Sequence, residues 1–383
     1  MKKSKLKICT ILGTRPEIIR LSRVMNLLDS YFDHKIIHTG QNWDYELNEI
    51  FFKELDVRKP DHFLNVDTSS LGTVLGETIS KSEEVFSAEK PDAVIILGDT
   101  NSSLSGIIAK RMKIPIYHLE AGNRSFDPNV PEDINRKIID HIADFNLPYS
   151  EHARRNLLSE GLHPRWIYKT GSPMKEILTY NNKEIMSSTI LSKLNIKKNE
   201  YFLVSFHREE NVDSSENLTN ILTMLNQLSE DYHLPVIVST HPRTKNRMNK
   251  LSDIKLDDHI RFLSPFGFFD YIFLQMNAKC TISDSGTISE ESSILQFPAI
   301  HLRESTERPE SIDSGTMMIT GLDPFTVLNS ISLTIDKFSK KIDWMTPPEY
   351  QQTTFSWKVL QIILGTVKLS DKWSGIRHND LSG

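Results

Sequence analysis

Short apolar runs alternate along the chain with longer amphipathic stretches. The first half contains KICTIL, HKIIHTG, DAVIILGD, IPIYHLEAG, FNLPYS and IYKTG, and the second half contains YFLVSFH, PVIVSTH, IRFLSP, CTISDSG, PAIHLR and MMITG. β-rich runs separated by helix-sized segments are typical of parallel sheets whose strands are connected by helices. The pattern therefore predicts an α/β protein.

The apolar runs form two groups, separated by the interval around residues 170–200. Two Rossmann-like domains that face each other across a cleft explain this grouping, and 383 residues suffice for two domains of ordinary size. We expect an N-terminal domain over residues 1–172 and a C-terminal domain over residues 173–364. The last segment, from about residue 365 to 383, can pack back on the first domain.

Composition excludes several classes of protein. With 38% hydrophobic and 25% charged residues the chain can bury a sizeable core, and the net charge of −5 includes no basic tract for nucleic acid. No apolar run reaches the roughly 18 residues that a membrane span needs. The first apolar run is expected to be a strand rather than a signal peptide. Cys9 and Cys280 lie in apolar runs and are expected to be buried free thiols, which fits a cytoplasmic protein.

Polar motifs follow almost every apolar run. Ligands of parallel α/β sheets bind at the carboxyl ends of the strands, so motifs at six such ends predict one site in the cleft. These ends carry Gly13-Thr14-Arg15, Gly98-Asp99-Thr100, Glu120-Ala121-Gly122, His207-Arg208-Glu209, His241-Pro242-Arg243 and Asp284-Ser285-Gly286-Thr287.

The segment SDSGTISEESS indicates nucleotide binding. It is typical of a strand end, a glycine turn and a helix N-terminus, where Ser285, Gly286 and Thr287 can offer N–H groups and hydroxyls to a phosphate. Glu291 can accept the hydroxyls of a ribose, although a carboxylate there can also serve only the helix dipole. No GxGxxG motif follows the first apolar run, so NAD chemistry is disfavoured.

Other residues are candidates for the rest of a nucleotide. Arg15 and Arg20 near a helix start can meet an anion, and Arg308 is a second candidate cation, with a salt bridge to a nearby glutamate as the alternative. Phe266 and Tyr271 belong to an aromatic-rich segment that either packs in the core or flanks a flat base.

Three carboxylates suit proton transfer. Asp99 and Glu120 end apolar runs, and Glu132 begins the following helix-like segment. Acids that converge on one site repel, which raises the pKa of at least one of them towards neutrality. Arg124 and Arg136 are candidates to balance this charge, and His207 is expected to face the phosphates. No metal is implied, because the histidines and acids lack a tight ligand spacing, and His38, His118 and His141 are expected to be structural.

An ordered set of motifs resembles one known family. GTRPEIIR, TGQN, LGDTNS, HLEAGNRSFD, PEDINRKIIDH, TGSPM, HREENVD, STHPR, SDSGTISEE and TERPE are similar to the non-hydrolysing UDP-N-acetylglucosamine 2-epimerases over roughly residues 5–325. The resemblance implies a GT-B fold of two Rossmann-like domains, a homodimer, a UDP-sugar substrate and no cofactor.

Three positions depart from the common family pattern. Asn123 replaces leucine, Thr287 replaces glycine and Arg20 replaces lysine. These residues, together with HREENVD and STHPRT, resemble the branch that makes UDP-N-acetyl-L-fucosamine from UDP-2-acetamido-2,6-dideoxy-L-talose for bacterial capsule and O-antigen. The form of TGQN makes allosteric activation by UDP-GlcNAc doubtful.

The resemblance also implies roles for single residues. Phe266 stands where the family has a polar residue, so only a backbone contact to uracil carries over. Acid/base or substrate roles are implied for Asp99, Glu120, Glu132 and His207, and UDP binding is implied for Arg15, Arg20, Phe266, Tyr271, Ser285, Gly286, Glu291 and Arg308. The wider set of expected substrate-binding residues adds Asn123, Arg124, Arg136, His241 and Thr287.

The expected reaction inverts C2 of the sugar without NAD. UDP leaves C1 while a base takes the C2 proton, which gives a 2-acetamidoglycal, and UDP then adds back as a proton reaches the opposite face. The residues do not assign the base and the acid. The alternatives are a UDP-GlcNAc to UDP-ManNAc 2-epimerase, a GT-B glycosyltransferase, a hydrolysing epimerase and a nucleotide-sugar sensor.

Overall fold

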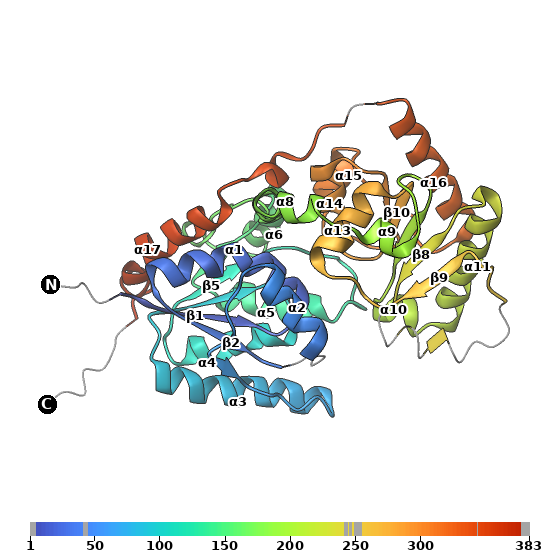
Figure 1. Ribbon diagram of the computed structural model, residues 1–383. Coiled ribbons are helices and arrows are strands. Elements are labelled where there is room, and N and C mark those ends of the chain that lie inside the picture. Colours follow the sequence, from blue (N-terminus) through green and yellow to red (C-terminus); the bar gives the residue numbers. More distant parts are fainter. Residues whose placement is uncertain are drawn as a thin grey trace, which may run out of the picture. The chain divides into compact units, whose positions relative to one another are not determined.

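The computed structural model describes residues 5–40, 45–240, 244, 247–248, 255–342 and 344–376. The chain divides into two α/β units (Figure 1): unit 1 comprises Met1–Ile177 and Gln352–Gly383, and unit 2 comprises Leu178–Gln351. The division after Ile177 lies five residues beyond the expected boundary at residue 172. Each unit contains one parallel sheet, so the α/β class expected from the sequence is found in both.

Unit 1 contains a six-stranded parallel sheet in the order β3-β2-β1-β4-β5-β6. Its central strands are almost wholly apolar because helices cover both faces of a parallel sheet. One core cluster includes Ile11, Val94 and Ile116 of the sheet together with Phe86 and Ile139 of the helices. The strands are β1 (Lys7–Leu12), β2 (Asp33–His38), β3 (His62–Phe63), β4 (Ala93–Leu97), β5 (Ile116–Leu119) and β6 (Phe145–Leu147).

The helices of unit 1 begin where the sequence supplies capping groups. Thr14 and Glu17 form a capping box at the start of α1, where Pro16 also favours a helix start, and Ser70 and Ser150 cap α3 and α6 through their side chains. The helices are α1 (Arg15–Tyr31), α2 (Tyr45–Glu54), α3 (Leu71–Glu89), η1 (Asn101–Leu104), α4 (Ser105–Arg111), α5 (Glu132–Ile142), α6 (Glu151–Ser159), η2 (Pro164–Trp166) and α7 (Met174–Tyr180), which ends in unit 2.

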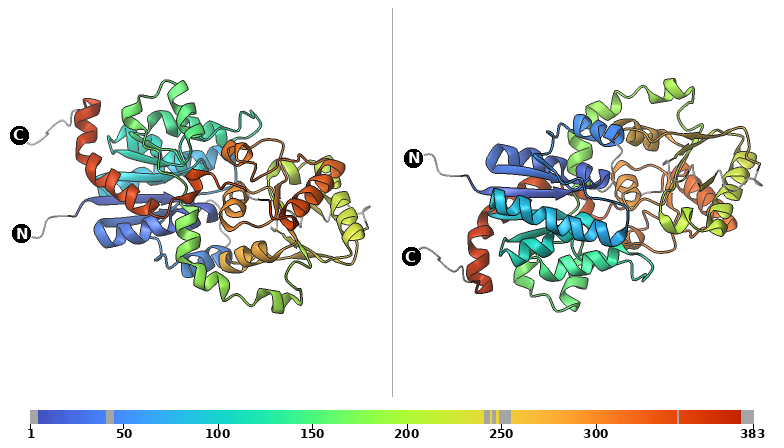
Figure 2. Two further views of the ribbon diagram at one scale, coloured as in Figure 1. Left: turned by 90° about the horizontal axis from the view of Figure 1, so that it is seen from above. Right: turned by 90° about the horizontal axis from the view of Figure 1, so that it is seen from below.

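The C-terminal helix α17 (Phe355–Ser374) also belongs to unit 1 and packs beside α1 (Figure 2). The Tyr117 hydroxyl lies 2.7 Å from Thr366 Oγ1, and the Ser356 N–H donates to Glu176 Oε2 at 2.8 Å. The chain therefore returns to unit 1 from Gln352 rather than from about residue 365. The reason is that the apolar face of α17 is buried from its first residue, Phe355.

Unit 2 contains a five-stranded parallel sheet in the order β11-β10-β7-β8-β9. Its largest core cluster lies between this sheet and helices α11 and α16, and a second cluster lies beneath α9 and α13. The elements are α8 (Asn182–Met186), α9 (Ile190–Leu194), β7 (Phe202–Ser205), α10 (Glu209–Val212), α11 (Ser215–Tyr232), β8 (Val236–Ser239), β9 (Ile260–Leu263), α13 (Phe268–Asn277), β10 (Cys280–Ser283), α14 (Ile288–Leu295), β11 (Ala299–His301), α15 (Pro309–Asp313), α16 (Pro324–Ser339) and η3 (Pro348–Gln351).

Two apolar runs that predict strands form single bridges instead. IYKTG contributes the bridge between Ile167 and Asn146, and MMITG contributes the bridge between Ile319 and His301. Each run is short because a turn follows at once, with φ values of 81° at Gly171 and 63° at Gly321. The apolar residues are still buried or half-buried, but too few backbone groups remain to extend the ladder.

The two cysteines are buried free thiols, as expected. Burial raises the pKa of Cys9 to about 12 and raises that of Cys280 as well, so neither is a reactive thiolate at neutral pH. Among the described helices, none combines the length and the hydropathy that crossing a membrane requires.

Candidate active site

The carboxyl ends of β4 and β5 bring two predicted acids into two buried ion pairs. Asp99, directly after the turn that ends β4, pairs with Arg136 of α5, and Glu120, directly after β5, pairs with Arg20 of α1. The side chains of Arg20 and Arg136 are 6% and 1% exposed, and those of Glu120 and Asp99 are 7% and 18% exposed. A guanidinium therefore lies beside each carboxylate, and each predicted acid is held by a cation at the end of its strand.

Glu120 has an unusual backbone conformation. Its φ is 64°, in the left-handed region, which costs a residue with a side chain about 1–2 kcal/mol. Gly122 follows with φ of 79°, and a Cβ there would lie 2.3 Å from the carbonyl oxygen of Ala153. The chain therefore leaves β5 through a tight turn that only glycine permits at position 122, and strain of this kind is common at functional sites.

Glu132 lies at the first turn of α5 and is partly exposed. The same helix contacts the Asp99 loop through Asn135, whose Nδ2 donates to the Asp99 carbonyl at 3.0 Å and to Asn101 Oδ1 at 3.1 Å. Asn135 and Arg136 therefore fix the start of α5 against the loop that carries Asp99. Glu132, the third predicted acid, therefore lies on the helix that is hydrogen-bonded to the loop of Asp99.

Asn123 and Arg124 differ in their surroundings. Asn123 is buried, and its Nδ2 lies 3.5 Å from Glu120 Oε1, beside a candidate catalytic acid. Arg124 donates to Asp140 Oδ2 at 2.7 Å and to both carboxylate oxygens of Glu160 at 2.8 and 2.6 Å, and its side chain is 1% exposed. This placement favours a structural role for Arg124 rather than the predicted contact with substrate.

Glu17 was not expected in the site and connects two of its loops. Its carboxylate accepts the N–H groups of Gly13 and Thr14, both at 2.7 Å, and the hydroxyls of Thr14 at 3.0 Å and Thr100 at 2.7 Å. Glu17 therefore occupies the N–H groups at the start of α1, where Rossmann-like domains often bind phosphate. Arg15, next to this turn, is partly exposed, and its guanidinium lies 5.5 Å from the Phe51 ring centroid.

In unit 2, Asp284 organises the ends of β7 and β10. Its Oδ2 accepts the N–H groups of His207 at 2.9 Å and Arg208 at 3.0 Å and the amide of Asn211 at 3.0 Å. Its Oδ1 lies 3.2 Å from Nδ1 of His207, whose side chain is 42% exposed. Burial alone would raise the pKa of Asp284, but the charge of His207 and these hydrogen bonds hold it well below the usual range. Asp284 thus orients His207, with the imidazole partly in solvent.

The Ser285–Thr287 turn precedes α14 and is partly exposed. The Ser285 and Thr287 hydroxyls lie 3.0 Å apart. At Gly286, an added Cβ would meet no atom of the described residues within 4 Å. Nothing in that part of the chain therefore requires glycine at 286, whereas a ligand lying against the backbone would require it.

Glu291 and Arg308 are buried behind this turn. Glu291 accepts a hydrogen bond from Gln275 Nε2 at 2.7 Å. Arg308 Nε lies 3.3 Å from Glu290 Oε2, and both side chains are at most 3% exposed. The salt bridge to a neighbouring glutamate, which was the alternative to diphosphate binding by Arg308, is therefore present.

Phe266 and Tyr271 pack against the core cluster that contains Tyr201 and Leu274, and both rings remain partly exposed. Their core role is thus established, while a base contact by their exposed edges stays a prediction. His241 lies outside the described residues.

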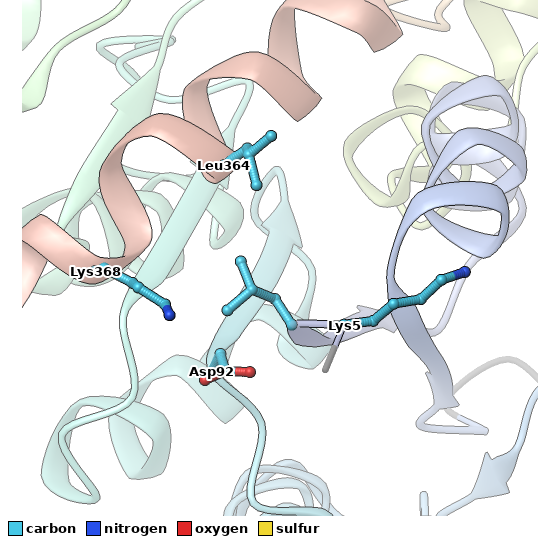
Figure 3. A pocket seen from close by; sticks show the side chains of 5 residues that line it. Lys5, Asp92, Leu364 and Lys368 are labelled. Carbon is cyan, nitrogen blue, oxygen red and sulfur yellow. The ribbon is translucent and has the colours of Figure 1, made fainter. Parts of the chain in front are cut away.

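A pocket of about 320 Å³ lies at the opposite, amino-terminal edge of the unit 1 sheet (Figure 3). It is lined by Lys5 and Leu6 before β1, Asp92 before β4, and Leu364 and Lys368 of α17. None of the sequence-predicted site residues lines it, so it is separate from the candidate active site.

Sequence reasoning missed two buried acids of the site, Glu17 and Asp140, and named Asp284 only within a strand-end motif, without a role of its own. Asp284 directly follows a strand, and this position was a usable signal. Glu17 and Asp140 lie on helices, where an acid is ordinarily a solvated or capping residue. The two acids are distinguished only by the groups that contact their carboxylates, and these groups belong to other elements. Thr100 donates to Glu17, and Gly122 and His118 contact Asp140.

Comparison with known proteins gives a consistent result. The family model described as UDP-N-acetylglucosamine 2-epimerase matches residues 27–364. A protein of Methanocaldococcus jannaschii named UDP-N-acetylglucosamine 2-epimerase is 36% identical over 350 residues, which cover 89% of this chain and 95% of the relative.

Solved structures agree with this match. The UDP-N-acetylglucosamine 2-epimerase from Rickettsia bellii is 46% identical, with a TM-score of 0.91 over 97% of this chain and 100% of the other. The Methanocaldococcus jannaschii UDP-GlcNAc 2-epimerase in complex with UDP-GlcNAc and UDP is 34% identical, with a TM-score of 0.88 over 94% and 100% of the two chains. The predicted GT-B fold is thereby confirmed.

Proposed function

Since this chain belongs to the UDP-N-acetylglucosamine 2-epimerase family and is thus an isomerase, we propose that it inverts C2 of UDP-GlcNAc to form UDP-ManNAc without hydrolysis. The observation that carries this proposal is the pair of buried ion pairs, Asp99 with Arg136 and Glu120 with Arg20, at adjacent strand ends. A glycosyltransferase would need one base for its acceptor, whereas inversion at C2 needs a proton removed from one face and another returned to the opposite face.

The chemistry explains why carboxylates are needed. The C2 proton is not acidic because no carbonyl group is adjacent to C2. Breaking the bond between C1 and the UDP oxygen while a carboxylate takes this proton gives a 2-acetamidoglycal and UDP. The reverse addition of UDP, with a proton delivered to the other face, completes the inversion. We assign Asp99, Glu120 and Glu132 to these proton transfers, without choosing between base and acid.

Unit 2 would hold the leaving group. The Ser285–Thr287 turn offers hydroxyl and N–H groups at the start of α14, where an anion is stabilised by the helix terminus. Glu291 would accept the ribose hydroxyls, and His207, oriented by Asp284, would donate to the diphosphate. The resemblance to the family implies Arg15 as a further cation for the departing UDP.

The second candidate substrate is UDP-2-acetamido-2,6-dideoxy-L-talose, with UDP-N-acetyl-L-fucosamine as the product. It is favoured by Asn123, whose amide lies 3.5 Å from Glu120, and by Arg20, which pairs with the same carboxylate. Both residues depart from the common family pattern at positions beside a candidate catalytic acid. Asn123 and Arg20 therefore change the groups that surround Glu120, and through it the site of the reacting sugar, as a change of sugar substrate would require.

Proton NMR in D₂O tests both substrates. The enzyme is incubated with UDP-GlcNAc in one tube and with UDP-2-acetamido-2,6-dideoxy-L-talose in another. Deuterium at C2 of UDP-ManNAc supports the first proposal, and deuterium at C2 of UDP-N-acetyl-L-fucosamine alone supports the second. The absence of exchange in both tubes would overturn the epimerase assignment for these sugars. UDP release only after a sugar acceptor is added would indicate a glycosyltransferase.

A further inference from the structure

His118 of β5 is a completely buried histidine to which the mechanism above assigns no role. Its Nε2 lies 2.7 Å from the carbonyl oxygen of Gly98, and its Nδ1 lies 2.9 Å from Asp140 Oδ1. Gly98 directly precedes Asp99, and His118 itself precedes Glu120 by two residues. The imidazole therefore lies between the backbone segments that carry two of the proposed acids.

The two neighbours of the ring are both hydrogen-bond acceptors. Nε2 lies within hydrogen-bond distance of the Gly98 carbonyl, and Nδ1 lies against Asp140, whose other oxygen pairs with Arg124. The ring, Asp140 and Arg124 therefore form one contiguous set of buried contacts, which continues to Glu160.

Asp140 of α5 reaches the second strand end as well. Both of its carboxylate oxygens lie 3.2 Å from the N–H of Gly122, in the turn that follows Glu120. Burial raises the pKa of Asp140, but the hydrogen bonds and charges of His118 and Arg124 outweigh this effect and hold it below the usual range. One ionised carboxylate thus contacts the Glu120 turn directly and the Asp99 loop through His118.

We propose that His118 and Asp140 are positioning residues that fix the spacing between Asp99 and Glu120. This inference rests on the proposed function, because it takes both acids to act on one sugar. A base and an acid on opposite faces of C2 must both lie within hydrogen-bond reach, and a displacement of about 1 Å can cost ~10²-fold in rate. Neither His118 nor Asp140 needs to touch the substrate to have this effect.

The test compares two buried aspartates of unit 1. Asp144 accepts the N–H of Ile116 at 3.0 Å and pairs with Lys110 at 2.7 Å, at the amino end of β5 and therefore away from the site. Asp140→Asn is expected to lower kcat by roughly tenfold to a hundredfold, with KM and the calorimetric Kd for UDP within about threefold of wild type. Asp144→Asn should lower the melting temperature with little change in kcat.

Equal kcat values for wild type and folded Asp140→Asn would overturn the proposal, as would equal losses in both variants. If Asp140→Asn does not fold, His118→Gln provides the second variant, with the same expected loss of kcat. Gln can replace the donor to Gly98 but not the ring contact with Asp140.

A spectroscopic measurement needs no substrate. Nitrogen-15 correlation spectra of the histidine rings should show His118 signals that shift in Asp140→Asn but not in Asp144→Asn, and His118 signals unchanged in Asp140→Asn would refute the bridge. If the wild type is inert on both UDP-sugars, the proposed function fails together with the catalytic part of this inference. The ring spectrum still decides whether the bridge exists, so the two failures are distinguishable.

Discussion

At the scale of single residues, the site combines charge pairing with backbone strain. Asp99 and Glu120 each face one arginine, and Glu120 also adopts a left-handed conformation. The arginines place a positive charge beside each carboxylate, and the left-handed φ of Glu120 turns the chain where β5 ends. These features favour proton transfer by groups that are fixed before the substrate binds.

Substituting Asp99 tests this assignment directly. Asp99→Asn should lower kcat by ~10²-fold or more, because the amide cannot accept the proton. Asp92→Asn is the matched control, since Asp92 lies before the amino end of the same strand and accepts the Lys7 N–H at 2.7 Å. Steady-state rates and C2 deuterium exchange measure both effects. Comparable rates for the two variants would remove Asp99 from the mechanism.

Glu17 gives a prediction about stability. In Glu17→Gln an NH₂ group replaces one oxygen that faces hydrogen-bond donors, so the variant should lose about 1–3 kcal/mol of unfolding free energy. Thermal unfolding measures the loss. Glu151→Gln is the control, because Glu151 begins α6 with a side chain 40% exposed and should leave the melting temperature unchanged. Equal melting temperatures for wild type and Glu17→Gln would show that the four hydrogen bonds contribute little.

The sequence predicts the candidate acids better than it predicts their partners. Asp99 and Glu120 follow apolar runs, and a parallel sheet places such ends at one edge. Their pairing with Arg136 and Arg20 depends on helix faces that are distant in sequence, so no local pattern indicates it. Arg124 and Arg308 illustrate the limit, because an arginine near a site can bind either a ligand or a buried carboxylate and the sequence is the same in both cases.

At the scale of elements, buried acids connect the loops that follow the strand ends. Asp284 contacts the β7–α10 loop, Glu17 contacts the loop after β4, and Asp140 contacts the turn after β5. The strands followed from the apolar runs only in part. β3 has two residues, too short for a pattern, while IYKTG and MMITG have the composition of strands but are stopped by glycine turns.

The connection made by Asp284 should depend on pH. Its pKa in the folded protein lies well below the value of about 3.9 for an unfolded aspartate, so its contribution to stability is complete above that value and is lost as the pH falls below it. The difference in melting temperature between wild type and Asp284→Asn should be constant from about pH 5 to 8 and shrink below about pH 4. A difference that does not shrink at all between pH 5 and pH 3 would contradict the assignment.

Asp231→Asn is the control for this titration. Asp231 is exposed at the end of α11, and its substitution should change the melting temperature little at any pH.

At the scale of the whole molecule, each unit has its own core. The core clusters of unit 2 contain only residues of Leu178–Gln351. Unit 1 instead takes its last helix from the far end of the chain. The grouping of the apolar runs predicted the two-domain organisation. It did not predict that the chain returns to unit 1 at Gln352, because the sequence of α17 predicts a helix but not the sheet that this helix covers.

Fragments should therefore differ in their ability to fold. Residues 178–351 should give dispersed amide NMR signals alone, whereas residues 1–177 should not. Phe355, Val359, Leu360, Ile363 and Val367 are buried apolar residues of α17, and at about 1.5–3 kcal/mol each their loss is comparable to the whole stability of a domain, about 5–15 kcal/mol. Residues 352–383 added in trans should restore the fold of 1–177. A dispersed spectrum of 1–177 alone would show that α17 is dispensable.

Unit 1 is formed by two segments that are far apart in the sequence, which also has a consequence for biosynthesis. The ribosome must add the 174 residues between Ile177 and Gln352 before α17 can be made, which takes roughly 9–35 s at about 5–20 residues per second. During this interval the apolar surface that α17 later covers is open to chaperones and to other nascent chains. Unit 2 can complete its core first, so the part of the enzyme that is translated first is the part that finishes folding last.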